Sequence, residues 1–134
     1  MNQRPVVRHL IACLEIEPSA NNRGVTLRDL IHAIVRLPDE PFPCIRPNMA
    51  LFALLTDGRG VHDFTIELAV FDRGREQLVR PAWGPVRRDL GQDPALVHGF
   101  PIRLTNIVFP AAGQYTFHLL CNGQPVAEEH VTVR

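Results

Sequence analysis

A regular succession of short apolar segments and turn residues limits this chain to an all-β fold. The clearest segment is 63–71, where apolar and more polar residues alternate with the period of two expected for a strand with one buried face. Asp57-Gly58-Arg59-Gly60 and Asp72-Arg73-Gly74 bound it as turns. Similar segments recur about every ten residues, which is typical of sandwiches. The pattern predicts a single immunoglobulin-like antiparallel β-sandwich of about seven to nine strands over residues 1–134.

Residues 25–37 fit two periodicities. Read as a strand, Val25, Leu27 and Ile31 share a face that Asp29 interrupts. Read as a helix, the same stretch carries an apolar stripe at spacings of three and four, with a capping contact available at its start. The strand is favoured because the surrounding segments are strands, and a short helix remains the alternative.

The central part of the chain alternates between proline-rich and apolar segments. Residues 38–47 contain four prolines and predict an extended connector. Residues 49–55 are apolar on both faces, as in a central strand of a two-sheet core or a strand at a subunit interface. A short strand is expected at 77–80, and residues 81–94 are predicted to be irregular.

The end of the chain predicts a hairpin, because Asn122-Gly123 is a strong two-residue turn signal between two alternating segments. Residues 109–117 resemble the Pro-x-x-Gly-x-Tyr-x-Phe approach to a late strand in immunoglobulin-like sandwiches. In that arrangement the tyrosine hydroxyl fixes the corner of the chain. The resemblance assigns Tyr115 and Gly113 to such a structural corner.

The order of the elements also resembles a family of uncharacterised bacterial and phage proteins with an immunoglobulin-like sandwich. The matching segments are Pro41-Phe42-Pro43, 49–55, Gly60-Val61-His62 and Gly113-Gln114-Tyr115. The resemblance covers most of the chain and implies the fold but no activity. The inter-sheet cysteine pair and core tryptophan of true immunoglobulin domains are missing from the pattern.

Charge and hydropathy narrow the classes of partner. The chain has 14 basic and 14 acidic residues, whereas proteins that bind nucleic acid through phosphates usually carry a basic excess. No apolar run reaches the roughly 18 residues of a membrane helix. The first ten residues, which include Arg4, Pro5 and Arg8, do not read as a signal peptide. We therefore expect a cytoplasmic protein that binds neither nucleic acid nor membrane.

The chemistry-bearing residues match no complete motif. Three cysteines, Cys13, Cys44 and Cys121, are expected to be free thiols, with a Cys13–Cys121 bridge or a reactive Cys44 as alternatives. Six histidines raise the possibility of a cupin-like metal site, but only His62 and His118 lie near the relevant sequence patterns and at the wrong spacing. His118 is expected to face away from the Tyr115 side of its strand. We assign no catalytic residue, metal ligand or cofactor.

The segment around Trp83 is the best candidate for a partner site. An exposed tryptophan flanked by Arg80, Arg87 and Arg88 could anchor a protein partner, although the favoured interpretation has Trp83 closing an open end of the sandwich. The leading hypothesis is a non-enzymatic binding or interaction module with a protein partner or self-association. The alternatives are a structural subunit of a homo-oligomeric or phage-like assembly and a cupin-like metal-dependent small-molecule enzyme.

Overall fold

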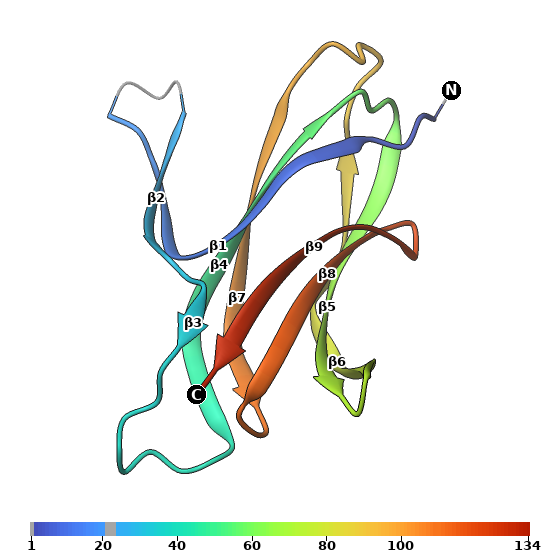
Figure 1. Ribbon diagram of the computed structural model, residues 1–134. Coiled ribbons are helices and arrows are strands. Elements are labelled where there is room, and N and C mark those ends of the chain that lie inside the picture. The colour runs from blue at the N-terminus through green and yellow to red at the C-terminus, as the bar shows by residue number, and fades with distance from the viewer. Residues whose placement is uncertain (1, 21–23) are drawn as a thin grey trace.

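The structure, a computed structural model, describes residues 2–20 and 24–134 as two packed β-sheets (Figure 1). The described residues contain nine strands and no helix, so the predicted antiparallel sandwich is confirmed. One sheet has the order β2-β1-β4-β7, and the other has the order β3-β9-β8-β5-β6. The strands are β1 (Val6–Pro18), β2 (Val25–Leu30), β3 (Ala33–Ile34), β4 (Cys44–Thr56), β5 (Val61–Asp72), β6 (Arg75–Asp89), β7 (His98–Phe109), β8 (Gly113–Cys121) and β9 (Gln124–Val133).

The core lies between the two sheets and follows from the alternation in the sequence. On β5, Phe64, Ile66 and Leu68 are fully buried, whereas the residues between them are on average more exposed. On β8, Tyr115 and Phe117 face the same core. Apolar side chains of β4 and β7 cover them from the other sheet. All neighbouring strands pair antiparallel except β3, which runs parallel to β9.

Strand β4 occupies the centre of the four-stranded sheet. It pairs with β1 over Ala50–Thr56 and with β7 over Cys44–Leu55. The segment 49–55 is therefore a central strand, one of the two predicted alternatives. A small second cluster of Cys13, Ile16 and Ala50 covers the outer face of this sheet, which explains the apolar residues on both sides of the strand. Three of the four prolines of the predicted connector precede β4, but the strand already begins at Cys44, so the connector ends earlier than predicted and Pro47 lies within the strand.

Residues 25–37 are extended, as favoured, but they form two strands in different sheets. β2 pairs with β1, and β3 pairs with β9. Asp29 has a φ of 54° near the end of β2, so the backbone departs there from regular strand geometry. The single apolar face predicted for this segment is wrong, because Val25, Val35 and Leu37 are exposed.

The prediction that residues 81–94 are irregular is wrong for most of the segment. β6 continues to Asp89 and carries Trp83 as a strand residue opposite Ile66. Three shifts in the register between β5 and β6 absorb the prolines and glycine. Edge strands tolerate proline because one side of the backbone needs no hydrogen-bonded partner.

The corner before β8 is closed by a tyrosine hydroxyl. Tyr115 Oη donates to the Ala111 carbonyl at 2.7 Å and accepts from the Ala111 backbone N–H at 3.2 Å. The ring is buried and packs edge-on against Phe109, with 5.0 Å between ring centroids. Gly113 begins β8 beside this corner. None of the described segments forms a helix long and apolar enough to cross a membrane.

Candidate binding groove between strands β1 and β4

The four-stranded sheet opens on one side because β1 leaves β4. The last paired residues of the two strands are Cys13 and Ala50. Beyond this point, residues 15–18 of β1 pair only with β2, and residues 44–49 of β4 pair only with β7. In Figure 1 the hairpin of β1 and β2 turns away from β4 and β7. The divergence leaves a groove between β1 and β4, hereafter the β1–β4 groove.

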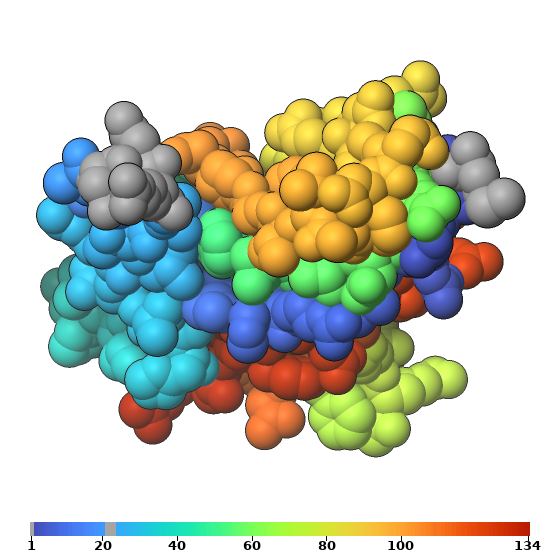
Figure 2. All heavy atoms as spheres, turned by 90° about the horizontal axis from the view of Figure 1, so that it is seen from above, coloured from blue at the N-terminus to red at the C-terminus, as the bar shows by residue number. Residues whose placement is uncertain are grey.

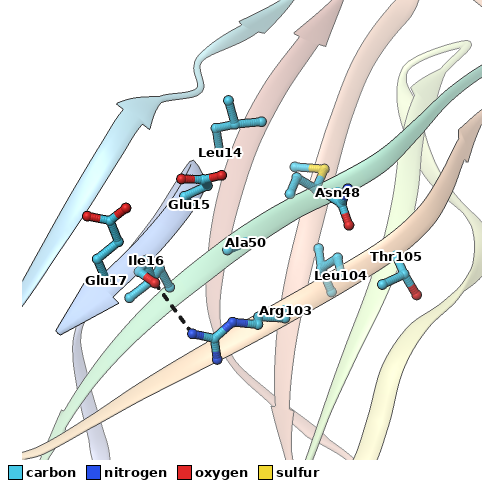
Figure 3. A pocket seen from close by; sticks show the side chains of 10 residues that line it. Leu14, Glu15, Ile16, Glu17, Asn48, Ala50, Arg103, Leu104 and Thr105 are labelled. Atoms are coloured by element: carbon cyan, nitrogen blue, oxygen red, sulfur yellow. Dashed lines mark hydrogen bonds between the residues drawn. The ribbon is translucent and has the colours of Figure 1, made fainter.

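A cavity of about 310 Å³ forms the first part of this groove (Figure 3). Leu14 and Ile16 of β1 contribute one wall, and Ala50 of β4 and Leu104 of β7 contribute the opposite side. The Arg103 guanidinium crosses the open end, where Nη2 donates to the Ile16 carbonyl at 3.4 Å. This contact connects β7 to the part of β1 that has no strand partner on the groove side.

A second cavity of about 230 Å³ continues the groove toward β3. It shares Leu14, Asn48 and Met49 with the first cavity, so these residues separate two adjoining depressions. Its remaining lining includes Ile31 and Ile34 from the segment around β3. The groove is thus a row of two mainly apolar cavities along the part of β4 that has no partner on the β1 side.

Apolar and charged side chains border the groove. Leu14 and Val35 are 44% and 60% exposed, respectively, although both are apolar. Glu15 lines the first cavity, is exposed, and has no ion-pair partner among the described residues. Figure 3 shows the Glu15 and Arg103 side chains on opposite sides of the cavity. From above, side chains of β4 are visible between the β1–β2 hairpin and residues 90–100 (Figure 2).

A partly buried cluster of polar side chains in the connector and the start of β4 lies at the far end of the groove. The Glu40 carboxylate accepts from the Cys44 thiol at 2.9 Å and from Arg46 Nη1 at 2.6 Å. These two hydrogen bonds lower the pKa of Glu40 to about 2. The Arg36 side chain also donates to the Glu40 carbonyl at 2.7 Å. The cluster fixes Arg46, which lines the second cavity, against the connector.

The thiols do not offer a nucleophile. Cys13, Cys44 and Cys121 are all free and buried, so the expectation of free thiols is confirmed and an exposed Cys44 is excluded. Burial raises the pKa of all three thiols, and for Cys44 the hydrogen bond to Glu40 adds to this effect. A reactive cysteine needs the opposite shift, toward the thiolate.

The two histidines considered for a cupin-like site lie on different faces of the five-stranded sheet. His62 is buried, and its Nε2 lies 2.8 Å from the Arg59 carbonyl. Its Nδ1 lies 3.0 Å from the Asn122 amide nitrogen. His118 lies on the outer face, away from Tyr115 and Phe117, as predicted from the alternation. The structure does not bring these two imidazoles together.

The residues predicted around Trp83 do not gather into one patch. Trp83 is half-buried and packs against the core from within the edge strand β6, not from a loop at an open end of the sandwich. Arg87 lies opposite Asp63 and pairs with it at 3.1 Å, whereas Arg88 lies opposite the buried His62 and over the Phe100 ring. The two guanidiniums therefore lie on opposite faces of β6. Arg80 is half-buried on the same strand. Partner binding by these residues stays a prediction.

The sequence gives no direct signal for the groove. It depends on where β1 parts from β4, and hence on contacts between segments more than 30 residues apart. The one hint in the sequence is the run of apolar residues near the end of β1. Within this run, Leu14 is exposed although the neighbouring apolar residues Cys13 and Ile16 are buried.

Comparison with known proteins identifies the family to which the fold belongs. Residues 29–134 match a family of unknown function, DUF6941. The chain is a member of this family, an uncharacterised group for which the structure defines a β-sandwich. The matched segment includes β3 to β9, and thus the β4 and β7 sides of the groove, but not β1. No curated protein matched the chain.

Proposed function

We propose that this protein is a non-enzymatic binding module that holds an extended peptide segment of a protein partner in the β1–β4 groove. The observation that carries the proposal is the row of two apolar cavities beside strand segments that have no strand partner on the groove side. Strand-like peptides are commonly recognised by sites that combine a free sheet edge with pockets for alternate side chains.

The arrangement of the cavities side by side suits an extended occupant. In a strand, side chains at positions i and i+2 point to the same side and are separated by about 6.6 Å. Two adjoining cavities that share Leu14, Asn48 and Met49 can accept two such side chains. The volumes of about 310 and 230 Å³ are large enough for leucine, methionine or phenylalanine side chains.

The charges around the first cavity favour a bound segment that carries charged residues of its own. Arg103 uses one N–H for the Ile16 carbonyl, which leaves further donors of its guanidinium for a carboxylate. Glu15 faces it from the other wall. A segment with an acidic residue beside one apolar anchor and a basic residue on the other side would complement both charges.

A display experiment tests this proposal. The full chain is used to select binders from a random nonapeptide library, and the affinities of enriched peptides are measured by fluorescence polarisation. We expect enrichment of apolar residues at i and i+2. Leu14→Asp should weaken binding at least tenfold, because it puts a charge between the two cavities. Leu78→Asp is the matched control, since Leu78 is 61% exposed on β6, on the other sheet.

Two outcomes would contradict the proposal. One is a set of enriched peptides whose affinities are equally insensitive to both substitutions. The other is a concentration-dependent dimer that Leu14→Asp abolishes, since a second copy of the chain would then be the occupant. Urea unfolding of both variants verifies that they fold, which the exposure of both leucines favours.

A further inference from the structure

An arginine without a counter-charge lies where β1 and β4 part. Cys13 and Ala50 are the last paired residues of these two strands, and Arg103 of β7 lies opposite Ala50. The Arg103 guanidinium crosses the first cavity and meets the Ile16 carbonyl at 3.4 Å (Figure 3). None of the ion pairs between described residues includes Arg103. The first cavity therefore carries a cation whose charge is uncompensated.

The β1–β4 groove is closed at the end where this cation lies. Beyond Cys13 and Ala50 the two strands are paired with each other, so an extended chain cannot continue between them. The first cavity includes Ala50 in its lining, and the second cavity leads away from this pair toward β3. A segment that occupies both cavities must therefore end, or leave the groove, at the first cavity.

The Arg103 guanidinium is suited to a carboxylate at this position. It uses one N–H of Nη2 for the Ile16 carbonyl, which holds it across the cavity. Its other N–H groups remain available, and a guanidinium can bind both oxygens of a carboxylate at once. The carboxylate at the C-terminus of a protein is ionised at neutral pH. A chain that ends in the first cavity would bring this group to Arg103.

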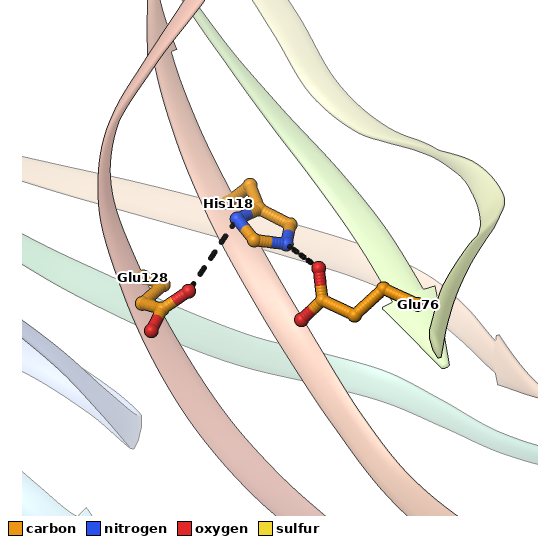
Figure 4. Close-up of side chains that lie close together, drawn as sticks. All are labelled: Glu76, His118 and Glu128. Carbon is orange, nitrogen blue, oxygen red and sulfur yellow. Dashed lines mark hydrogen bonds and ion pairs between the residues drawn. The ribbon is translucent and has the colours of Figure 1, made fainter. Parts of the chain in front are cut away.

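The outer face of the other sheet shows how charged groups are paired elsewhere in this protein. Glu76 and Glu128 approach opposite nitrogens of the His118 ring, at 2.7 and 3.9 Å, respectively (Figure 4). Both carboxylates of this histidine and glutamate cluster thus already face a partner that can carry the opposite charge. Arg103 lacks such a partner and lies beside an apolar cavity, which is the setting of a binding site rather than of a structural ion pair.

We propose that the β1–β4 groove receives the free C-terminus of a protein partner, with the terminal carboxylate on Arg103 and the last side chain in the first cavity. The inference rests on the proposed function and narrows its ligand from any extended segment to a chain end. Capture of a terminal carboxylate is a recurring mode of peptide recognition. The terminal carboxylate takes the place of the acidic residue that complements Arg103.

The position of the carboxylate also sets the direction of the bound segment. Strand β4 runs toward the Cys13 and Ala50 pair, and β1 runs away from it. A segment whose C-terminus lies in the first cavity is therefore antiparallel to β1 and parallel to β4. Its last residue and the residue two positions earlier point to the same side of the segment and can fill the first and second cavities.

Paired peptides with and without a terminal carboxylate test the inference. Two arrays carry the same random nonapeptides, attached through their N-termini, with free carboxylates on one array and C-terminal amides on the other. The full chain is applied to both, and the best binders are measured in solution by fluorescence polarisation. We expect amidation to weaken binding by about tenfold or more, because it removes the charge that Arg103 binds. Acetylation of the N-terminus should leave the affinity unchanged.

Arginine variants locate the effect. Arg103→Gln should remove the difference in affinity between the acid and the amide. Arg87→Gln is the matched control, since Arg87 pairs with Asp63 on the other sheet, and it should retain the difference. Because the measured quantity is the ratio of two affinities for the same variant, a general loss of binding does not imitate the result. Circular dichroism of both variants verifies that they fold.

The outcomes separate this inference from the proposed function. Binders that Leu14→Asp weakens, but that bind equally well as acid and amide, would overturn the chain-end assignment and leave peptide binding intact. Sensitivity to acetylation instead of amidation would overturn it in favour of an N-terminus held by Glu15, which lies across the cavity from Arg103. Loss of the acid–amide difference in both arginine variants would show a general charge effect. If neither array yields a binder that depends on Leu14, both proposals are contradicted.

Discussion

Removing a single oxygen tests the corner before β8. Tyr115→Phe keeps the buried ring and its edge-on contact with Phe109 but deletes the hydroxyl that bonds twice to Ala111. Each hydrogen bond contributes about 0.5–1.5 kcal/mol, so the free energy of unfolding should fall by about 1–3 kcal/mol. For a chain of this size the melting temperature should fall by roughly 3–9 °C.

Urea unfolding followed by tryptophan fluorescence measures this difference, and the denaturant slope should not change, since the buried surface is the same. Thr132→Val is the control, because it removes an exposed hydroxyl from β9 and should change stability by less than about 0.5 kcal/mol. A loss below about 0.3 kcal/mol in Tyr115→Phe would refute the corner as a stabilising feature.

Two further predictions concern the backbone of β6 and the connector. Gly84 has a φ of 84°, and an added Cβ would lie 2.5 Å from the Phe64 carbonyl oxygen, so Gly84→Ala should cost more than about 2 kcal/mol in thermal unfolding. Gly74 has a similar φ, but an added Cβ there would lie in open space. If Gly74→Ala lost as much stability as Gly84→Ala, the steric argument would be contradicted. Folding lowers the pKa of Glu40 from 4.5 to about 2, so its contribution is present above pH 4.5 and is lost as the pH falls toward 2. Glu40→Gln should therefore lose less stability between pH 6 and pH 3 than the wild type in urea titrations, and equal losses would contradict the assignment.

Local sequence patterns were sufficient to predict the strands in which apolar and polar residues alternate with burial. The alternation on β5 and β8 and the turn at Asn122-Gly123 predict these elements because a period of two and a two-residue loop are local properties. The same reasoning misplaced Trp83. Proline and glycine weaken a strand in isolation, but the register shifts of an edge strand accommodate them.

The candidate sites lie beyond local patterns because they depend on register. A two-residue turn after Cys121 would place His118 opposite Ala127 if the hairpin were regular. The shift between Leu119 and Leu120 instead places it opposite Glu128 and turns that carboxylate to the outer face. One additional residue on β9 thus creates the histidine and glutamate cluster. The β1–β4 groove likewise follows from the point at which two strands separate.

Peptide binding in the β1–β4 groove is tested most directly by hydrogen–deuterium exchange. Exchange of the full chain is compared with and without the tightest nonapeptide selected from the library. We predict that protection increases at residues 14–17 and 46–49, along the two strand segments that have a partner on one side only. Protection confined to β6 around Trp83, with no change at β1 and β4, would contradict the groove and support the edge strand as the binding surface.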